Sequence, residues 1–94
     1  SKKVRSEQLS TYINQEVDLL KIDVEGCEDV IILELAKKDT LRLINSMIIE
    51  YHPYLCAKIK TLADFLDFLK QRQWNCVFSN LGENYLVYAN KAQL

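Results

Sequence analysis

The chain has 94 residues, 49% hydrophobic and 27% charged, a composition typical of one globular domain and not of a disordered chain. Its formal net charge of −1 provides no broad positive field, so we expect neither nucleic acid nor a membrane surface as a partner. No apolar run approaches the roughly 18 residues that a membrane span needs. The start, Ser-Lys-Lys-Val, also lacks the apolar core of a signal peptide.

The first expected elements are a short helix and a buried strand. Apolar residues at helical spacing predict the helix over residues 6–14, with Ser6 as its N-cap. A mostly apolar run predicts the strand over residues 17–24. Alternation puts the charged side chains at its far end on one face: Lys21, Asp23 and Glu25. Because burying unpaired charge is costly, that face either opens into a cleft or pairs its charges with a neighbouring strand.

A helix and a second strand are expected next along the chain. The pattern predicts a helix over residues 25–38, and its wide apolar face is expected to pack on a sheet and also on a further structural element. We interpret Glu28 and Asp29, in its first turn, as charges that complement the helix dipole. After a short helical turn over residues 41–44, a strand is expected over residues 46–52.

The last expected elements are an amphipathic helix and a β-hairpin. Thr61 and Asp64 form a capping-box-like start for a helix over residues 61–72. Two β-rich runs, 74–79 and 85–89, are joined by the turn-rich segment 80–84. The aromatic side chains expected in the core are Phe65, Phe68 and Trp74.

The order of these elements predicts an α/β fold. Strand–helix–strand units of this length give parallel strand pairs with right-handed crossovers, and the final hairpin adds one antiparallel strand. We therefore expect residues 1–94 to form a single domain with a three-layer, partly parallel sheet of about four strands, incomplete on one side.

Acidic side chains and one histidine follow the two expected parallel strands. Asp23 and Glu25 end the first strand, and Glu50 and His52 end the second. In open α/β sheets, ligands bind beyond the carboxyl ends of parallel strands. Such a cluster could act as a general base, bind a divalent cation or hydrogen-bond the hydroxyls of a ligand.

Structural interpretations of the same residues stay open beside these. An ion pair with Asp23 or Glu50 would satisfy a partly buried Lys21 without any catalysis. His52, just before Pro53, is a candidate base or a structural hydrogen-bonding group.

The three cysteines, Cys27, Cys56 and Cys76, are widely spaced and odd in number. They match neither a zinc spacing nor a disulfide framework, so no metal site is assigned to them. A reduced, cytoplasmic compartment is the simpler interpretation. Isolated cysteines are usually small buried hydrophobes, and we expect none of these to be a nucleophile.

Two segments closely resemble the FkbM-type methyltransferase family: Asp-Leu-Leu-Lys-Ile-Asp-Val-Glu-Gly-Cys-Glu at residues 18–28 and Ile-Ile-Glu-Tyr-His at residues 48–52. Residues 9–13 and 65–74 are also similar to that family in their spacing. The resemblance implies an S-adenosylmethionine-dependent enzyme, mostly O-methylating sugars or natural-product hydroxyls, on a Rossmann-like seven-stranded sheet.

The resemblance also implies that this is the C-terminal half of a class I methyltransferase domain. Its strands would be the fourth to seventh, in the order 4-5-7-6. The Gly-rich turn and the acidic residue that hold S-adenosylmethionine would belong to the missing half, so the fragment alone is expected to be inactive.

By position, the resemblance gives Asp23 and Glu25 cofactor-binding roles beside the transferred methyl group. His52, Glu50 and Asp23 become the catalytic candidates, with His52 or Glu50 as the base, and Lys21 an organiser of the site. The expected partner is a small-molecule acceptor.

An alternative of another class is a non-catalytic interaction module. The strand at residues 17–24 would be a bare apolar edge in such a fragment, and exposed edges invite pairing with a second chain. A homodimer formed through this strand edge is the corresponding expectation.

Overall fold

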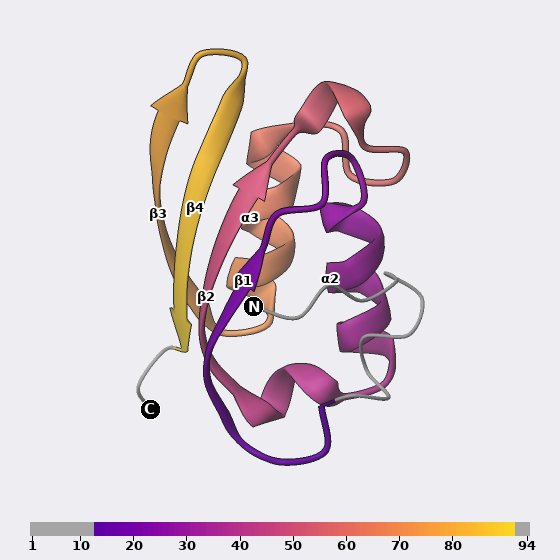
Figure 1. Ribbon diagram of the computed structural model, residues 1–94, viewed down its shortest axis with the longest axis vertical. Helices are drawn as coiled ribbons and strands as arrows, with labels where there is room; N and C mark the ends of the chain where they lie inside the picture. The colour runs from indigo at the N-terminus through magenta and orange to yellow at the C-terminus, as the bar shows by residue number, and fades with distance from the viewer. Residues whose placement is uncertain (1–12, 92–94) are drawn as a thin grey trace.

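The computed structural model describes residues 13–91 (Figure 1). The helix expected over residues 6–14 lies almost entirely outside this range. The described elements alternate as predicted, and they are β1 (Val17–Ile22), α2 (Glu28–Lys37), η2 (Thr40–Leu43), β2 (Ile44–Tyr51), η3 (Pro53–Leu55), α3 (Leu62–Gln71), β3 (Trp74–Leu81) and β4 (Asn84–Lys91).

The four strands form one sheet in the order β1-β2-β4-β3. β1 and β2 are parallel, with Lys21 opposite Ile48 and Ile22 opposite Ile49. β4 runs antiparallel to both of its neighbours, β2 and β3. The expected parallel pair and the single antiparallel strand are therefore confirmed. The last strand lies between β2 and β3, which leaves β1 and β3 as the edges of the described sheet.

Both α-helices of the described residues cover the same face of the sheet, to its right in Figure 1. A right-handed crossover that moves each time in the same direction along the sheet places successive helices on one face. The core between the layers consists of fully or almost fully buried side chains: Ile31, Ile32, Leu35, Met47, Ile49, Tyr51, Phe65, Leu69, Val87 and Ala89. Residues 13–91 thus form two layers, and a third layer is not among them.

The opposite face of the sheet is uncovered by any described element. One row across it consists of Lys21, Ile48, Tyr88 and Val77, which the strand register places side by side. Val77 is 66% exposed and Tyr88 is 37% exposed. A sheet face with this much apolar surface is typical of one that packs against a further layer.

Two element boundaries differ from the expectation for local backbone reasons. α2 begins at Glu28 and not at residue 25, because Glu25 (φ +22°) and Gly26 (φ +97°) form a turn that a helix cannot contain. The hairpin loop is shorter than the expected segment 80–84: Leu81 pairs directly with Asn84. Gly82, with φ +73°, supplies the positive φ that such a tight connection needs.

α3 follows its sequence signals closely. The backbone N–H of Asp64 donates to the side-chain oxygen of Thr61 at 3.1 Å, so the expected cap is confirmed. Phe65 is fully buried and stacks on Tyr51 with 4.2 Å between ring centroids, while Phe68 is only partly buried. Of the described helices, none has the length and apolar character that crossing a membrane requires.

Candidate functional site

The candidate site lies where β1 and β2 end. Parallel pairing carries both strands to the same edge of the sheet. The register Lys21–Ile48, continued by two residues, brings Asp23 beside Glu50. Three of the predicted site residues thus come from two strand ends and meet in one place: Asp23 from β1, and Glu50 and His52 from β2.

Asp23 and Glu50 are in direct contact through their carboxyl groups. A hydrogen bond to Asp23 is the main cause that raises the pKa of Glu50, and the negative charge of Asp23 adds to it. Burial and the charge of Glu25 also raise this pKa, whereas His52 lowers it. Two carboxylates this close hold a shared proton more readily than either holds one alone. Glu25 reaches the pair through its charge only, and its side chain is exposed.

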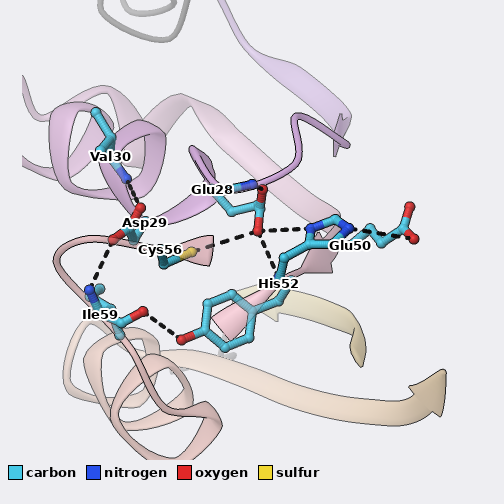
Figure 2. A network of polar contacts seen from close by, with 9 residues as sticks. Glu28, Asp29, Val30, Glu50, His52, Cys56 and Ile59 are labelled. Carbon is cyan, nitrogen blue, oxygen red and sulfur yellow. Dashed lines mark hydrogen bonds and ion pairs between the residues drawn. The ribbon is translucent and has the colours of Figure 1, made fainter. Parts of the chain in front are cut away.

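The imidazole of His52 lies between two carboxylates, as Figure 2 shows. Its Nε2 is 3.8 Å from Oε1 of Glu50, and its Nδ1 is 3.1 Å from Oε1 of Glu28. The residue is only 4% exposed, while the Glu50 side chain is 32% exposed. One ring nitrogen therefore faces the buried Glu28 carboxylate and the other faces the partly exposed carboxyl of Glu50.

Glu28 is a residue of this site that our sequence reasoning did not select. It is fully buried, and its Oε1 accepts from the backbone N–H of His52 at 2.7 Å. Its Oε2 accepts from the backbone N–H of Gly26 at 2.6 Å, and the Cys56 thiol lies 3.7 Å from Oε1. One carboxylate therefore joins the turn after β1 to the end of β2.

Asp29 is a second fully buried carboxylate at the start of α2. Its Oδ2 accepts from the backbone N–H groups of Lys58 at 2.6 Å and Ile59 at 2.9 Å. Its Oδ1 accepts from the backbone N–H of Val30 at 2.8 Å. Asp29 thus anchors the loop between η3 and α3, which runs past the candidate site (Figure 2).

A sequence signal for the burial of these acids was present. Glu28, Ile31, Ile32 and Leu35 occupy positions i, i+3, i+4 and i+7 of one helix stripe, and all four are buried. An acidic residue on an otherwise apolar stripe indicates a buried hydrogen-bond acceptor. The dipole interpretation of Glu28 and Asp29 is consistent with their place in the first turn but omits their tertiary partners.

The turn at Gly26 is held closely against η3. A Cβ atom at this position would lie 3.0 Å from Cβ and 3.1 Å from the carbonyl oxygen of Leu55. Glycine is therefore required both by its positive φ and by this close approach. The contact fixes the β1 end of the site against the β2 end.

The expected ion pair of Lys21 is wrong for the described structure. Lys21 is exposed, and within the described range, residues 13–91, it forms no ion pair with Asp23 or Glu50. The register explains this, because Asp23 lies opposite Glu50 while Lys21 lies opposite Ile48. The acidic pair is instead relieved by its shared hydrogen bond.

Two of the three cysteines, Cys56 and Cys76, add no reactive group to the site. Burial raises the pKa of the Cys56 thiol to about 12, and burial also raises that of Cys76. Thiols with raised pKa values are poor nucleophiles at neutral pH. Within the described part of the chain, no three His, Cys, Asp or Glu side chains are grouped so that they could hold a metal ion.

A hollow of about 500 Å³ lies at the other end of the sheet, where β2 and β3 begin. Its lining includes Arg42, Trp74 and Lys91 but no residue of the acidic cluster. The candidate site is therefore separate from this hollow. It is an acidic cluster at the strand ends in which Asp23 and Glu25 are exposed, Glu50 is partly exposed and His52 is buried, and its groups can accept a proton at imidazole and hydrogen-bond hydroxyl or cationic groups.

The chain was compared with known families, curated proteins and solved structures. A family model described as "Methyltransferase FkbM domain" matches residues 1–79. The matched range contains β1, α2, β2 and α3, and with them every residue of the candidate site. No curated protein and no solved structure matches the chain.

Proposed function

The chain belongs to the FkbM methyltransferase family, and from that premise we propose that it forms the acceptor-activating part of an S-adenosylmethionine-dependent O-methyltransferase. The observation that supports the proposal most is the arrangement of His52 beside the paired carboxyls of Asp23 and Glu50 at the ends of two parallel strands. Open α/β sheets bind their ligands at this edge.

The acidic groups at the end of β1 fit the proposed cofactor. S-adenosylmethionine, when bound, would supply a methyl group on a positively charged sulfur. Its sulfonium, amino and ribose hydroxyl groups suit carboxylate partners. Asp23 and Glu25 are both exposed and follow directly on β1, and we assign them to hold the cofactor.

His52 is the proposed base. A general base must lie within hydrogen-bond reach of the proton that it removes, either directly or through one water. The Nε2 atom of His52 faces the partly exposed Glu50 carboxyl, and in this proposal the acceptor hydroxyl approaches from this side, directly or through one water. In this proposal, Asp23 and Glu50 hydrogen-bond the acceptor and pass the proton from the site to solvent.

The acceptor class follows from the same groups. Carboxyl and carboxylate oxygens clustered on an open surface hydrogen-bond polyols well, since each oxygen accepts from a separate hydroxyl. The polar character of the cluster favours a sugar or another hydroxyl-bearing small molecule over an apolar acceptor. We therefore propose hydroxyl O-methylation.

We also propose that the four strands correspond to the fourth to seventh strands of a seven-stranded sheet. β1 lies at an edge of the described sheet, and Leu19 on it is 54% exposed. The uncovered face of the sheet would receive the third layer of a complete methyltransferase fold. On this proposal, residues 13–91 do not bind the cofactor fully or turn over alone.

Calorimetry and turnover measurements on the full natural protein test the proposal. We expect S-adenosylmethionine to bind, and Asp23→Asn to weaken binding about 10- to 100-fold, because a hydrogen bond to a charged group contributes about 1.5–3 kcal/mol. Asp18→Asn, an exposed acid of the same strand, is the matched control and should leave binding unchanged.

His52→Asn separates chemistry from binding. It should bind S-adenosylmethionine like the wild type, while formation of S-adenosylhomocysteine with a panel of methyl glycosides falls about 10²- to 10⁴-fold. A full-length protein that binds no S-adenosylmethionine would refute the proposal.

Self-association is the second candidate function, and the edge position of β1 favours it. Sedimentation of the wild type and of Leu19→Lys distinguishes the two. A dimer that the substitution dissociates, without any binding of S-adenosylmethionine by the wild type, would support the interaction module.

A further inference from the structure

We infer that Glu28 is a positioning residue for His52: it holds the imidazole in the tautomer that carries its proton on Nδ1 and leaves Nε2 free to accept one. The catalytic consequence rests on the proposed function, because it needs His52 to be the base. The orientation of the ring itself rests only on contacts within the described residues.

The contacts surround the Glu28 carboxylate with donors. Its Oε1 receives the backbone N–H of His52 at 2.7 Å, and Nδ1 of the same residue lies 3.1 Å away. Its Oε2 receives the backbone N–H of Gly26 at 2.6 Å. Both oxygens thus face N–H groups that cannot accept a proton in return.

These contacts favour the ionised form of Glu28. An O–H on Oε2 would face the N–H of Gly26, and an O–H on Oε1, donated to Nδ1, would weaken the bond that this oxygen accepts from the backbone N–H of His52. An ionised carboxylate only accepts. It follows that Nδ1 of His52 must be the donor in the 3.1 Å contact.

The neutral imidazole has one proton on its two nitrogens. With the proton on Nδ1, the lone pair of Nε2 is directed at the other side of the ring, where Glu50 lies 3.8 Å away. Figure 2 shows the ring between Glu28 and Glu50. Proton uptake at Nε2 then creates an imidazolium whose charge the buried Glu28 carboxylate offsets.

Asp29 provides an internal comparison for this role. It is the next residue in the chain, it is also fully buried, and it also accepts from backbone N–H groups of a loop. It has no hydrogen bond to the His52 ring. A change in the protonation or orientation of the imidazole that occurs on substitution of Glu28 but not of Asp29 therefore indicates loss of positioning and not loss of general stability.

Nitrogen-15 NMR of the imidazole tests the inference without any variant of Glu28. The spectrum of the full natural protein is recorded beside that of His52→Gln, which assigns the signal of this ring. We expect the neutral ring to be protonated on Nδ1. A neutral ring that carries its proton on Nε2 would overturn the inference whether or not the protein transfers methyl groups.

Kinetics of Glu28→Gln provide the second arm. The amide oxygen can still accept from His52, but the negative charge that stabilises the imidazolium is lost. We expect kcat to fall about 10- to 100-fold with the dissociation constant of S-adenosylmethionine unchanged, in the range seen when groups that orient a functional histidine are removed. Asp29→Asn should lower stability but keep the tautomer and the kcat of the folded fraction. Unchanged kcat in Glu28→Gln would contradict the inference.

Discussion

Asp29→Asn should destabilise the fold by far more than an exposed carboxylate substitution does. In the wild type, Oδ2 accepts from two backbone N–H groups and Oδ1 accepts from a third. Asparagine retains one oxygen, which can stay in the Oδ2 position. Its NH₂ group must then face the backbone N–H of Val30, so this partly buried donor loses its acceptor. The backbone N–H groups of Lys58 and Ile59 keep an acceptor, but one without a negative charge.

The magnitude follows from these contacts. Loss of one hydrogen bond to a charged acceptor costs about 1.5–3 kcal/mol, and weakening the remaining pair brings the total to about 2–4 kcal/mol. With a urea m-value of about 1–2 kcal/mol per molar for a domain of this size, the unfolding midpoint should fall by about 1–4 M.

Urea unfolding followed by tryptophan fluorescence measures this, since Trp74 is the single tryptophan of the chain and is 3% exposed. Asp64→Asn is the control. Asp64 is exposed in the first turn of α3, where the dipole interaction is worth about 0.3–1 kcal/mol. Equal midpoint shifts in the two variants would show that the buried acceptor role of Asp29 is wrong.

Two further substitutions test the site geometry. The pKa of Glu50 is raised in the folded state by Asp23, so the folded protein is favoured while Glu50 is protonated and loses this contribution as pH rises through that pKa. Glu50→Gln should therefore raise Tm by about 1–3 °C at pH 8 and leave Tm unchanged at pH 3. An equal gain in Tm at both pH values would contradict the contact between Glu50 and Asp23. Gly26→Ala should lower the free energy of unfolding in urea by about 2–4 kcal/mol, against about 1 kcal/mol for Gly82→Ala. Gly82 shares the positive φ but has open space around it and lacks the Leu55 contact. Equal losses in the two variants would show that the close approach to Leu55 does not matter.

Patterns of apolar residues predicted the strands, the helices and the parallel pairing well, because those features follow from which faces must be buried. The meeting of Asp23 with Glu50 also followed from the sequence: matching the apolar faces of two parallel strands aligns their polar faces as well. Local chemistry was enough for the cap at Thr61, where donor and acceptor are three residues apart.

The roles of Glu28 and Asp29 could not be derived in the same way. Their partners are backbone N–H groups of residues 52, 58 and 59, and a backbone donor leaves no trace in the side-chain pattern. The late start of α2 has a related cause. Close contact with η3, more than 25 positions away along the chain, sets the turn at Glu25 and Gly26, so local helix propensity does not decide it.

The most direct test of the central claim is an NMR titration of the full natural protein with S-adenosylmethionine, with amide signals of this chain assigned. We predict that the largest shifts fall on residues 23–26 and 50–53, at the ends of β1 and β2. Shifts concentrated instead around Trp74 and Arg42, at the opposite end of the sheet, or no shifts at all, would contradict the placement of a methyl-transfer site at these strand ends.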